Sequence, residues 1–265
     1  MTMKSKRVLV TGGGSGIGRA IAVEAAAQGA ETVIVADISP ELLAETEALI
    51  AAAGAKSVAL RIDMADGQQV RDMIDAAIAA AGGLDTLVNN VGVIDTGFVP
   101  GEQANIVDLP EEVWDAVMNI NVKSMWLATK YAAPHLRASD RGPSIVNAAS
   151  VSGMMGYKTP AYSVSKAAVI QLTRTTAISL ANEVRCNSFS PGSFRTTMAQ
   201  RHIDAAADPV EQERHMSGAH LIPRLGDPVE VARVACFLAS DAASFMTGTN
   251  VPVDGGTMAW RGLRS

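Results

Sequence analysis

The sequence predicts an α/β fold in which helices cover both faces of a parallel sheet. Short apolar, β-branched runs alternate along the chain with longer alanine-rich amphipathic runs, and this alternation is typical of βαβ units joined by right-handed crossovers. The short runs are apolar almost throughout, as expected of strands buried on both faces. Because open α/β sheets of this size often remain undivided, we expect one domain over residues 1–265.

The individual elements follow from the same patterns. Strands are expected at 7–11, 32–36, 57–62, 85–89, 144–148, 184–189 and 250–253. Helices are expected at 17–28, 40–53, 68–81, 111–137, 160–180 and 228–238. Two stretches, 93–110 and 196–227, show neither pattern and are expected to be irregular. Long loops in a compact domain are usually functional, so both are candidates for shaping a site.

Composition excludes several classes of function. The formal net charge is -5 and the pI is about 5.4, so the basic footprint of a nucleic-acid-binding protein is missing. Cys186 and Cys236 lie far apart without a CxxC spacing, which indicates reduced packing residues. The four histidines have no metal-binding spacing, so no catalytic metal is expected. No window has the length of a membrane span or of a signal peptide, and we expect a soluble cytoplasmic protein without membrane partners.

A glycine-rich turn joins the first strand to the first helix. It reads Thr-Gly-Gly-Gly-Ser-Gly-Ile-Gly and matches TGxxxGxG rather than GxGxxG. Glycines let the backbone approach a diphosphate closely, and the amides at the start of the helix bind its negative charge. Such a turn alone is a weak signal, but this position is where a nucleotide binds in these folds. The expected contacts are Gly12, Ser15, Gly16, Ile17 and Gly18.

Acidic residues end the second and third strands at the same edge. A carboxylate at Asp37 can accept both ribose hydroxyls of an adenosine and would repel the extra phosphate of NADP, which favours NAD. The alternative is a helix-capping Asp, but Ser39 and Pro40 already supply a cap and a first helical proline. Ile38 is expected beside Asp37. Asp63 and Met64 are expected near the adenine, although a turn is nearly as good an explanation for Asp63.

Tyr162 and Lys166 lie four residues apart on a helix, so a phenol and an ammonium share one helical face. A free phenol titrates near pH 10, and a neighbouring cation favours its ionised form. Such a tyrosine is suited to acid/base work. A lone YxxxK is nevertheless common, and a surface pair is the better explanation until other motifs support it.

Together these motifs resemble the short-chain dehydrogenase/reductases. The resemblance covers about residues 7–256 and also rests on Asn-Asn-Val-Gly at 89–92, Asn121, Ser150 and Pro-Gly at 191–192. It implies a single Rossmann-like domain with a doubly wound, seven-stranded parallel sheet and a nicotinamide cofactor at its carboxyl edge. Dimers or tetramers, formed through the helices at 111–137 and 160–180, are implied as well.

The resemblance also implies a role for each site residue. Tyr162 exchanges a proton with the substrate oxygen, Lys166 lowers the phenol pKa and holds the nicotinamide ribose, and Ser150 hydrogen-bonds the substrate. Asn121 holds a water that relays the proton. The cofactor contacts implied beyond the glycine turn and the acidic strand ends are Asn90, Val91, Gly92, Tyr162, Lys166, Pro191, Gly192, Phe194 and Thr196. Two of these depart from the pattern: Val91 replaces an alanine, and Phe194 an isoleucine or valine.

Substrate contacts are expected from the irregular segments. Ser152, Tyr157 and Met198 are the candidates, with Phe98 and Ile106 as possible pocket walls. Methionines at 154, 155 and 198 favour a cyclic or aromatic alcohol, although they could equally pack the edge of the sheet. Residues 196–227 are expected to form a mobile lid, and residues 257–265 a short tail, in which Trp260 either caps a neighbouring subunit or frays.

Three functions remain open from the sequence. The first is an NAD-dependent dehydrogenase that acts on a secondary alcohol, cyclic or aromatic. The second is an NADPH-dependent ketone or 3-oxoacyl reductase, against which Asp37 and the missing basic residue at Ser15 argue. The third is a dinucleotide-binding sensor or scaffold without chemistry, which an intact set of four catalytic residues makes improbable.

Overall fold

Parallel strands form one sheet in the order β3-β2-β1-β4-β5-β6-β7. The computed structural model describes residues 3–218 and 220–260, and these contain seven strands. Their bounds are β1 Arg7–Thr11, β2 Thr32–Asp37, β3 Lys56–Arg61, β4 Thr86–Asn89, β5 Ser144–Ala148, β6 Arg185–Pro191 and β7 Asn250–Val253. The predicted fold class, a doubly wound parallel sheet of Rossmann type, is confirmed.

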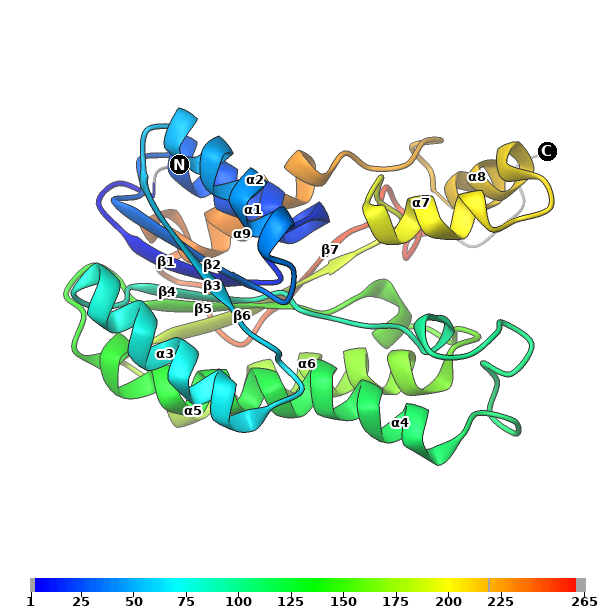
Figure 1. Ribbon diagram of the computed structural model, residues 1–265, viewed down its shortest axis with the longest axis horizontal. Helices are drawn as coiled ribbons and strands as arrows, with labels where there is room; N and C mark the ends of the chain where they lie inside the picture. Colours follow the sequence, from blue (N-terminus) through cyan, green and yellow to red (C-terminus); the bar gives the residue numbers. More distant parts are fainter. Residues whose placement is uncertain (1–2, 219, 261–265) are drawn as a thin grey trace.

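Helices cover the sheet on both faces (Figure 1). α1, α2 and α9 lie on one face, and α3, α4, α5 and α6 lie on the other. The helix bounds are α1 Gly16–Ala27, α2 Pro40–Ala52, α3 Gly67–Ala81, α4 Glu111–Met118, α5 Ser124–Arg137, α6 Pro160–Ser179, α7 Thr197–Asp204, α8 Pro209–Gly218 and α9 Pro228–Ala239. The helix expected at 111–137 is interrupted by a π turn, Asn119–Lys123, between α4 and α5.

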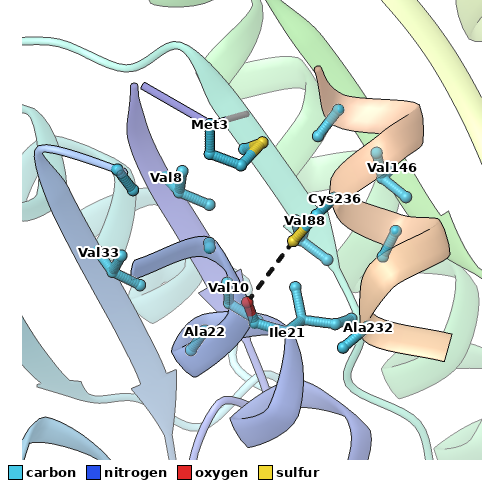
Figure 2. Close-up of a cluster of buried hydrophobic side chains, with 14 of the residues drawn as sticks. Met3, Val8, Val10, Ile21, Ala22, Val33, Val88, Val146, Ala232 and Cys236 are labelled. Carbon is cyan, nitrogen blue, oxygen red and sulfur yellow. Dashed lines mark hydrogen bonds between the residues drawn. The ribbon is translucent and has the colours of Figure 1, made fainter. Parts of the chain in front are cut away.

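Alternating side chains of the strands build a core on each face. In β1, Val8 and Val10 pack with Ile21 of α1 and Cys236 of α9 (Figure 2), whereas Leu9 belongs to the cluster under α3 and α5. This division follows from the two-residue period of a strand. Both cysteines are buried and unbonded, as predicted, and burial raises the pKa of Cys186 to about 12.

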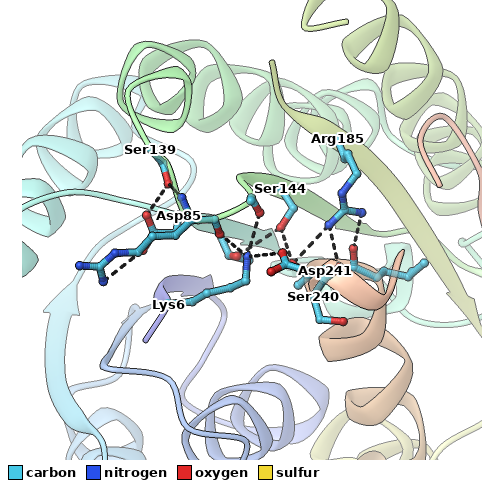
Figure 3. Close-up of polar contacts among 12 residues, drawn as sticks. Lys6, Asp85, Ser139, Ser144, Arg185, Ser240 and Asp241 are labelled. Carbon is cyan, nitrogen blue, oxygen red and sulfur yellow. Dashed lines mark hydrogen bonds and ion pairs between the residues drawn. The ribbon is translucent and has the colours of Figure 1, made fainter. Parts of the chain in front are cut away.

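Polar side chains close the amino-terminal edge of the sheet (Figure 3). The buried Lys6 donates to the carbonyls of Arg141 and Gly142 and pairs with Asp241. Asp85, ahead of β4, accepts from Arg7 at 2.7 Å. These contacts join the starts of neighbouring strands, and the carboxyl-terminal edge remains available for a ligand.

The order in which the chain adds strands reverses at β1. From β1 the chain proceeds to β2 and β3 and then returns to β4, which pairs with the other side of β1. Ligands of doubly wound sheets bind outside the strand ends at such a switch point. The fold therefore points to a site where β1, β2 and β4 end.

The stretch at 196–227 is not irregular, and in this respect the prediction was wrong. It contains α7 and α8. Each begins at a cap that was not recognised in the sequence. The Thr196 hydroxyl accepts from the amide of Ala199, and Asp208 accepts from the amides of Val210 and Glu211. Capping side chains satisfy amides that would otherwise be unpaired, so they stabilise short, polar helices such as α7 and α8.

Candidate active site

A cavity of about 500 Å³ opens at the carboxyl-terminal edge of the sheet. Its lining combines the glycine turn, the ends of β2, β4 and β5, the start of α6, and residues of α7 and α8. Most of the residues predicted for the site line it, namely Gly12, Ser15, Gly16, Ile17, Asp37, Ile38, Asp63, Met64, Asn90, Val91, Gly92, Ser150, Ser152, Tyr157, Tyr162, Lys166, Pro191, Gly192, Phe194, Thr196 and Met198. Residues far apart in the sequence thus share one space, while their individual roles stay predictions.

The glycine turn presents backbone amides to this cavity. Ser15 stands at the N-cap of α1, but its side chain makes no capping hydrogen bond, and the first turn contains no acidic residue. The amides at this helix start therefore remain available for an anion. Gly18 does not line the cavity. A Cβ there would lie 2.0 Å from the carbonyl oxygen of Gly12, so this glycine allows the helix to pack against the turn.

Asp37 lies at the end of β2, directly beside the glycine turn. One carboxylate oxygen accepts from the Gly14 amide at 3.0 Å, and the other accepts from the Ser39 amide at 3.2 Å. Ser39 caps α2 by accepting from the amide of Leu42, so Asp37 is not needed as the cap. Asp63 also lines the cavity and accepts from the amide of Ala65 at 2.9 Å. Both the turn and the ligand interpretation of Asp63 thus fit its position.

These features fit a dinucleotide. A phosphate suits the uncapped helix start, and a ribose suits the Asp37 carboxylate at the far side of the same turn. Gly92, which also lines the cavity, leaves room for the Lys166 ammonium, because a Cβ there would lie 3.0 Å from it.

Tyr162 and Lys166 both line the cavity from the first two turns of α6. The Lys166 ammonium lies 5.7 Å from the centre of the Tyr162 ring and donates to the carbonyl of Ala148 at 2.9 Å. That carbonyl belongs to β5, so the hydrogen bond ties the helix to the strand end. The predicted common direction of the two side chains is therefore present.

Burial governs the protonation of this pair. It lowers the pKa of Lys166 to about 8. It also raises the pKa of the Tyr162 phenol, and hydrogen bonding to Ser150 and Ser152 does not offset that effect. This direction is opposite to the lowering of the phenol pKa that was expected from Lys166, because burial disfavours the charged phenolate. Among the protein's own groups, both side chains are thus shifted toward their neutral forms.

Ser150 and Ser152 form a short hydroxyl chain beside Tyr162. Ser150 follows β5 and is buried. Its oxygen accepts from the Ser152 hydroxyl at 2.8 Å and from the Ser152 amide at 3.2 Å. With both acceptor positions used, the Ser150 hydroxyl can only donate, either to the Tyr162 phenol oxygen or to a substrate oxygen placed there.

Asn121 does not line the cavity. It lies in the π turn between α4 and α5, is fully buried, and exchanges two hydrogen bonds of 2.8 Å with the backbone of Val93. Its amide also donates to the Ser165 hydroxyl at 2.9 Å. The side chain thus holds the segment after β4 in place. The water-holding role implied for Asn121 stays a prediction, although π turns often occur at functional sites.

The two residues that depart from the pattern have clear packing partners. Val91 packs against the core under α3 and α5. Phe194 is buried in the opposite core, and a Cβ at Gly226 would lie 2.4 Å from its ring. Asn90 donates from its side chain to the carbonyls of Thr11 and Gly12, so it fixes the glycine turn from the neighbouring strand.

Several expected pocket walls lie elsewhere. Phe98 and Ile106 are exposed and do not line the cavity, and Met154 accepts from the Asn250 side chain instead. Val93 and Ile94, at the start of the same loop, line the cavity in their place. Because hydrophobicity alone does not report which part of a loop turns inward, the sequence suggested the wrong half.

His202 and Met216 line the cavity but were not among the site residues predicted from the sequence. His202 lies on α7, four residues and one turn after Met198, and Met216 lies on α8. The spacing of four would have indicated one shared face, had a helix been predicted there. Within residues 3–218 and 220–260, no cluster of three acidic, cysteine or histidine side chains is placed to hold a metal ion.

The remaining predictions concern membrane-spanning helices and the carboxyl-terminal tail. None of the helices in the described part of the chain is long and apolar enough to span a bilayer. Trp260 is half exposed at the end of the described chain, and the remainder of the predicted tail, 261–265, lies outside it.

The chain is similar to named dehydrogenases and reductases over nearly its whole length. A family model described as "Enoyl-(Acyl carrier protein) reductase" matches residues 12–258. The 2,5-dichloro-2,5-cyclohexadiene-1,4-diol dehydrogenase of Sphingobium indicum is 38% identical over 261 residues, covering 97% of this chain and 98% of the relative. The 3-oxoacyl-(acyl-carrier-protein) reductase of Thermotoga maritima is 36% identical over 262 residues, covering 97% and 99%.

A solved structure extends this similarity to three dimensions. Carveol dehydrogenase from Mycobacterium avium, in complex with NAD, matches with a TM-score of 0.88 and 29% sequence identity. The match covers 97% of this chain and 99% of that one.

Proposed function

The chain belongs to the short-chain dehydrogenase/reductase family, whose members act on CH–OH groups with a nicotinamide cofactor. From this premise we propose that the protein transfers hydride between a cyclic or aromatic secondary alcohol and NAD, with Tyr162 as acid/base. The observation that carries the proposal is the convergence of Tyr162, Lys166 and Ser150 on one cavity that Asp37 also lines. A bound nicotinamide would supply the hydride acceptor or donor.

Each residue has a distinct part in the proposed reaction. The Tyr162 phenol exchanges a proton with the substrate oxygen, and its neutral form, which burial favours, is ready to donate to a ketone. Ser150 donates a hydrogen bond to the same oxygen and stabilises the charge that develops there. Lys166 ties the start of α6, and with it Tyr162, to the end of β5 through its hydrogen bond to the Ala148 carbonyl. It also hydrogen-bonds the cofactor ribose.

NAD is proposed over NADP because of Asp37. Its carboxylate is held by two backbone amides and faces the place where an adenosine ribose would lie. A phosphate on that ribose would meet a fixed negative charge. Arg19, the cation of α1, already donates to the Gly14 carbonyl and to Glu45. It is therefore not free to bind the additional ribose phosphate of NADP.

A cyclic substrate is proposed from the walls of the cavity. Val93, Ile94, Met198 and Met216 provide apolar surface in the cavity that Ser150 and Tyr162 also line. Apolar walls around a few placed polar groups suit a compact hydrophobic alcohol. The relative from Sphingobium indicum is named for a cyclohexadiene diol, which agrees with this choice.

The proposal is tested by following NADH absorbance with a panel of cyclic, aromatic and sugar alcohols. We expect turnover with a cyclic or aromatic secondary alcohol and tighter binding of NADH than of NADPH. Tyr162→Phe should lower kcat by at least about 1,000-fold, because the proton acceptor is lost, while NADH binding stays within about twofold in a fluorescence titration.

Tyr131→Phe is the matched control, since Tyr131 lies on α5 and does not line the cavity. It should retain wild-type kcat. Activity in Tyr162→Phe equal to that of the control would refute the assigned base. Tighter binding of NADPH, together with turnover of a 3-oxoacyl thioester, would replace the proposal with the reductase alternative.

A further inference from the structure

The start of α6, the helix that carries Tyr162, lacks a cap of its own. Thr159 occupies the N-cap position, but its side chain makes no capping hydrogen bond and its hydroxyl is buried without a partner. Pro160 follows and has no N–H. The next two amides, of Ala161 and Tyr162, belong to the first helical turn and have no acceptor within the helix.

Asp95 supplies the acceptors for both amides. One carboxylate oxygen accepts from the Tyr162 amide at 2.8 Å, and the other accepts from the Ala161 amide at 3.0 Å. Asp95 is completely buried and lies in a 3-10 turn, Asp95–Gly97, some 65 residues earlier in the chain. A carboxylate at a helix N-terminus is favoured by the helix dipole, and hydrogen bonds to a charged acceptor are stronger than neutral ones.

The segment that carries Asp95 is also part of the cavity. Val93 and Ile94 line it, and Asn121 holds the backbone of Val93 through two hydrogen bonds. Three consecutive residues are thus fixed at one end to the π turn and at the other end to α6. A displacement of Asp95 would move the cavity wall and the backbone of Tyr162 together.

We propose that Asp95 is a positioning residue for the reaction, which fixes the backbone of Tyr162 against the wall of the substrate cavity. It touches neither substrate nor cofactor in this role. The inference rests on the proposed function for its kinetic consequence, but the bond between the loop and the helix can be tested without any turnover.

The kinetic test compares Asp95→Ala, Asp95→Asn and Asp227→Ala. Asp227 caps α9 through the amide of Val229, so its loss removes a helix cap away from Tyr162. In Asp95→Ala we expect kcat to fall by about 10- to 100-fold, because misplacing a reacting group by an ångström can cost that much. The affinity for NADH should stay within about twofold. Asp95→Asn, which retains one acceptor oxygen, should be intermediate, and Asp227→Ala should keep wild-type kcat.

Hydrogen exchange measured by mass spectrometry is the readout that does not depend on activity. Peptides covering 159–166 should exchange faster in Asp95→Ala than in wild type. In Asp227→Ala the same peptides should exchange at the wild-type rate, while peptides at the start of α9 should exchange faster. Faster exchange in Asp95→Ala alone, in a protein that turns over no alcohol, would refute the proposed function and still support the anchoring of the Tyr162 backbone by Asp95. Unchanged exchange in Asp95→Ala would overturn that anchoring.

Two kinetic results would also overturn the inference. One is wild-type kcat in folded Asp95→Ala or Asp95→Asn. The other is an equal loss of kcat in Asp227→Ala, which would assign the effect to helix capping in general. Should Asp95→Ala fail to fold, the comparison of Asp95→Asn with Asp227→Ala decides between the same two outcomes.

Discussion

Lys166 illustrates how a site residue can oppose the stability of the fold. Its side chain is almost fully buried, and burial lowers the pKa from the ordinary 10.5 to about 8. Between these two pH values the unfolded chain binds more protons than the folded one. The free energy of unfolding therefore rises as the pH increases from about 8 to about 10.5, and the full cost of the buried charge is present below pH 8.

Lys166→Met should therefore be more stable than wild type at pH 7. The shift corresponds to about 3 kcal/mol, from which loss of the hydrogen bond to Ala148 subtracts about 1 kcal/mol. We expect a net gain of about 2 kcal/mol in urea unfolding, together with loss of turnover. The gain should shrink as the pH rises to 10. Lys158→Met, on the exposed surface, is the control and should change little; a less stable Lys166→Met at pH 7 would contradict the argument.

Single residues were predictable where chemistry and local spacing coincide. Tyr162 and Lys166 could be paired from a spacing of four, and Asp37 from its place at a strand end. Asp95 and His202 could not, because their positions depend on how the loop after β4 and the helix α7 fold toward the site. Nothing in the sequence near Asp95 distinguishes it from an ordinary loop aspartate.

Between elements, the amino-terminal edge of the sheet depends on a buried ion pair. Asp85 is fully buried next to β4 and accepts from the Arg7 side chain and from the Ser139 hydroxyl. Burial alone would raise the pKa of Asp85, but the hydrogen bonds from Arg7 and Ser139 outweigh it and lower the pKa below its usual value. The stability that this carboxylate provides is present above its unfolded pKa, near 4, and is lost as the pH falls through the folded value.

Asp85→Asn should destabilise the protein by about 3 kcal/mol at pH 7, because it leaves the Arg7 charge without its partner. Urea unfolding at pH 7 and at progressively lower pH measures this, and the difference from wild type should narrow in acid. Glu183→Gln removes the exposed pair with Arg137 and should cost less than about 1 kcal/mol. Equal losses in the two variants would show that burial does not strengthen the Arg7 pair.

Elements with strong periodicity were predicted closely, and those defined by caps were not. The strands and the core helices agree with the patterns within a few residues. α7 and α8 were missed because both are short and mostly polar, and their starts depend on Thr196 and Asp208. The break between α4 and α5 was missed as well, since a π turn has no distinctive sequence pattern.

For the whole molecule, we propose that α5 and α6 form a subunit interface, because both helices expose large apolar side chains. Trp126 on α5 is 46% exposed, and on α6 Val164 is 45% and Ile178 is 76% exposed. Both helices lie on the face of the sheet opposite α1 and α2 (Figure 1). The subunit interface predicted from the sequence lies on these two helices, and their exposed apolar side chains agree with that prediction.

We therefore expect light scattering to give a dimer or tetramer of the 27.5 kDa chain. In a two-fold interface each substitution acts twice. Ile178→Glu, which removes at least about 1.5 kcal/mol of apolar burial per subunit, should then raise the dissociation constant by about 100-fold or more. Leu49→Glu on α2 alters a residue that is also 45% exposed but lies on the other face, and it should leave the mass unchanged. A wild-type monomer at micromolar concentration, or equal dissociation by Leu49→Glu, would exclude the α5–α6 face as the interface.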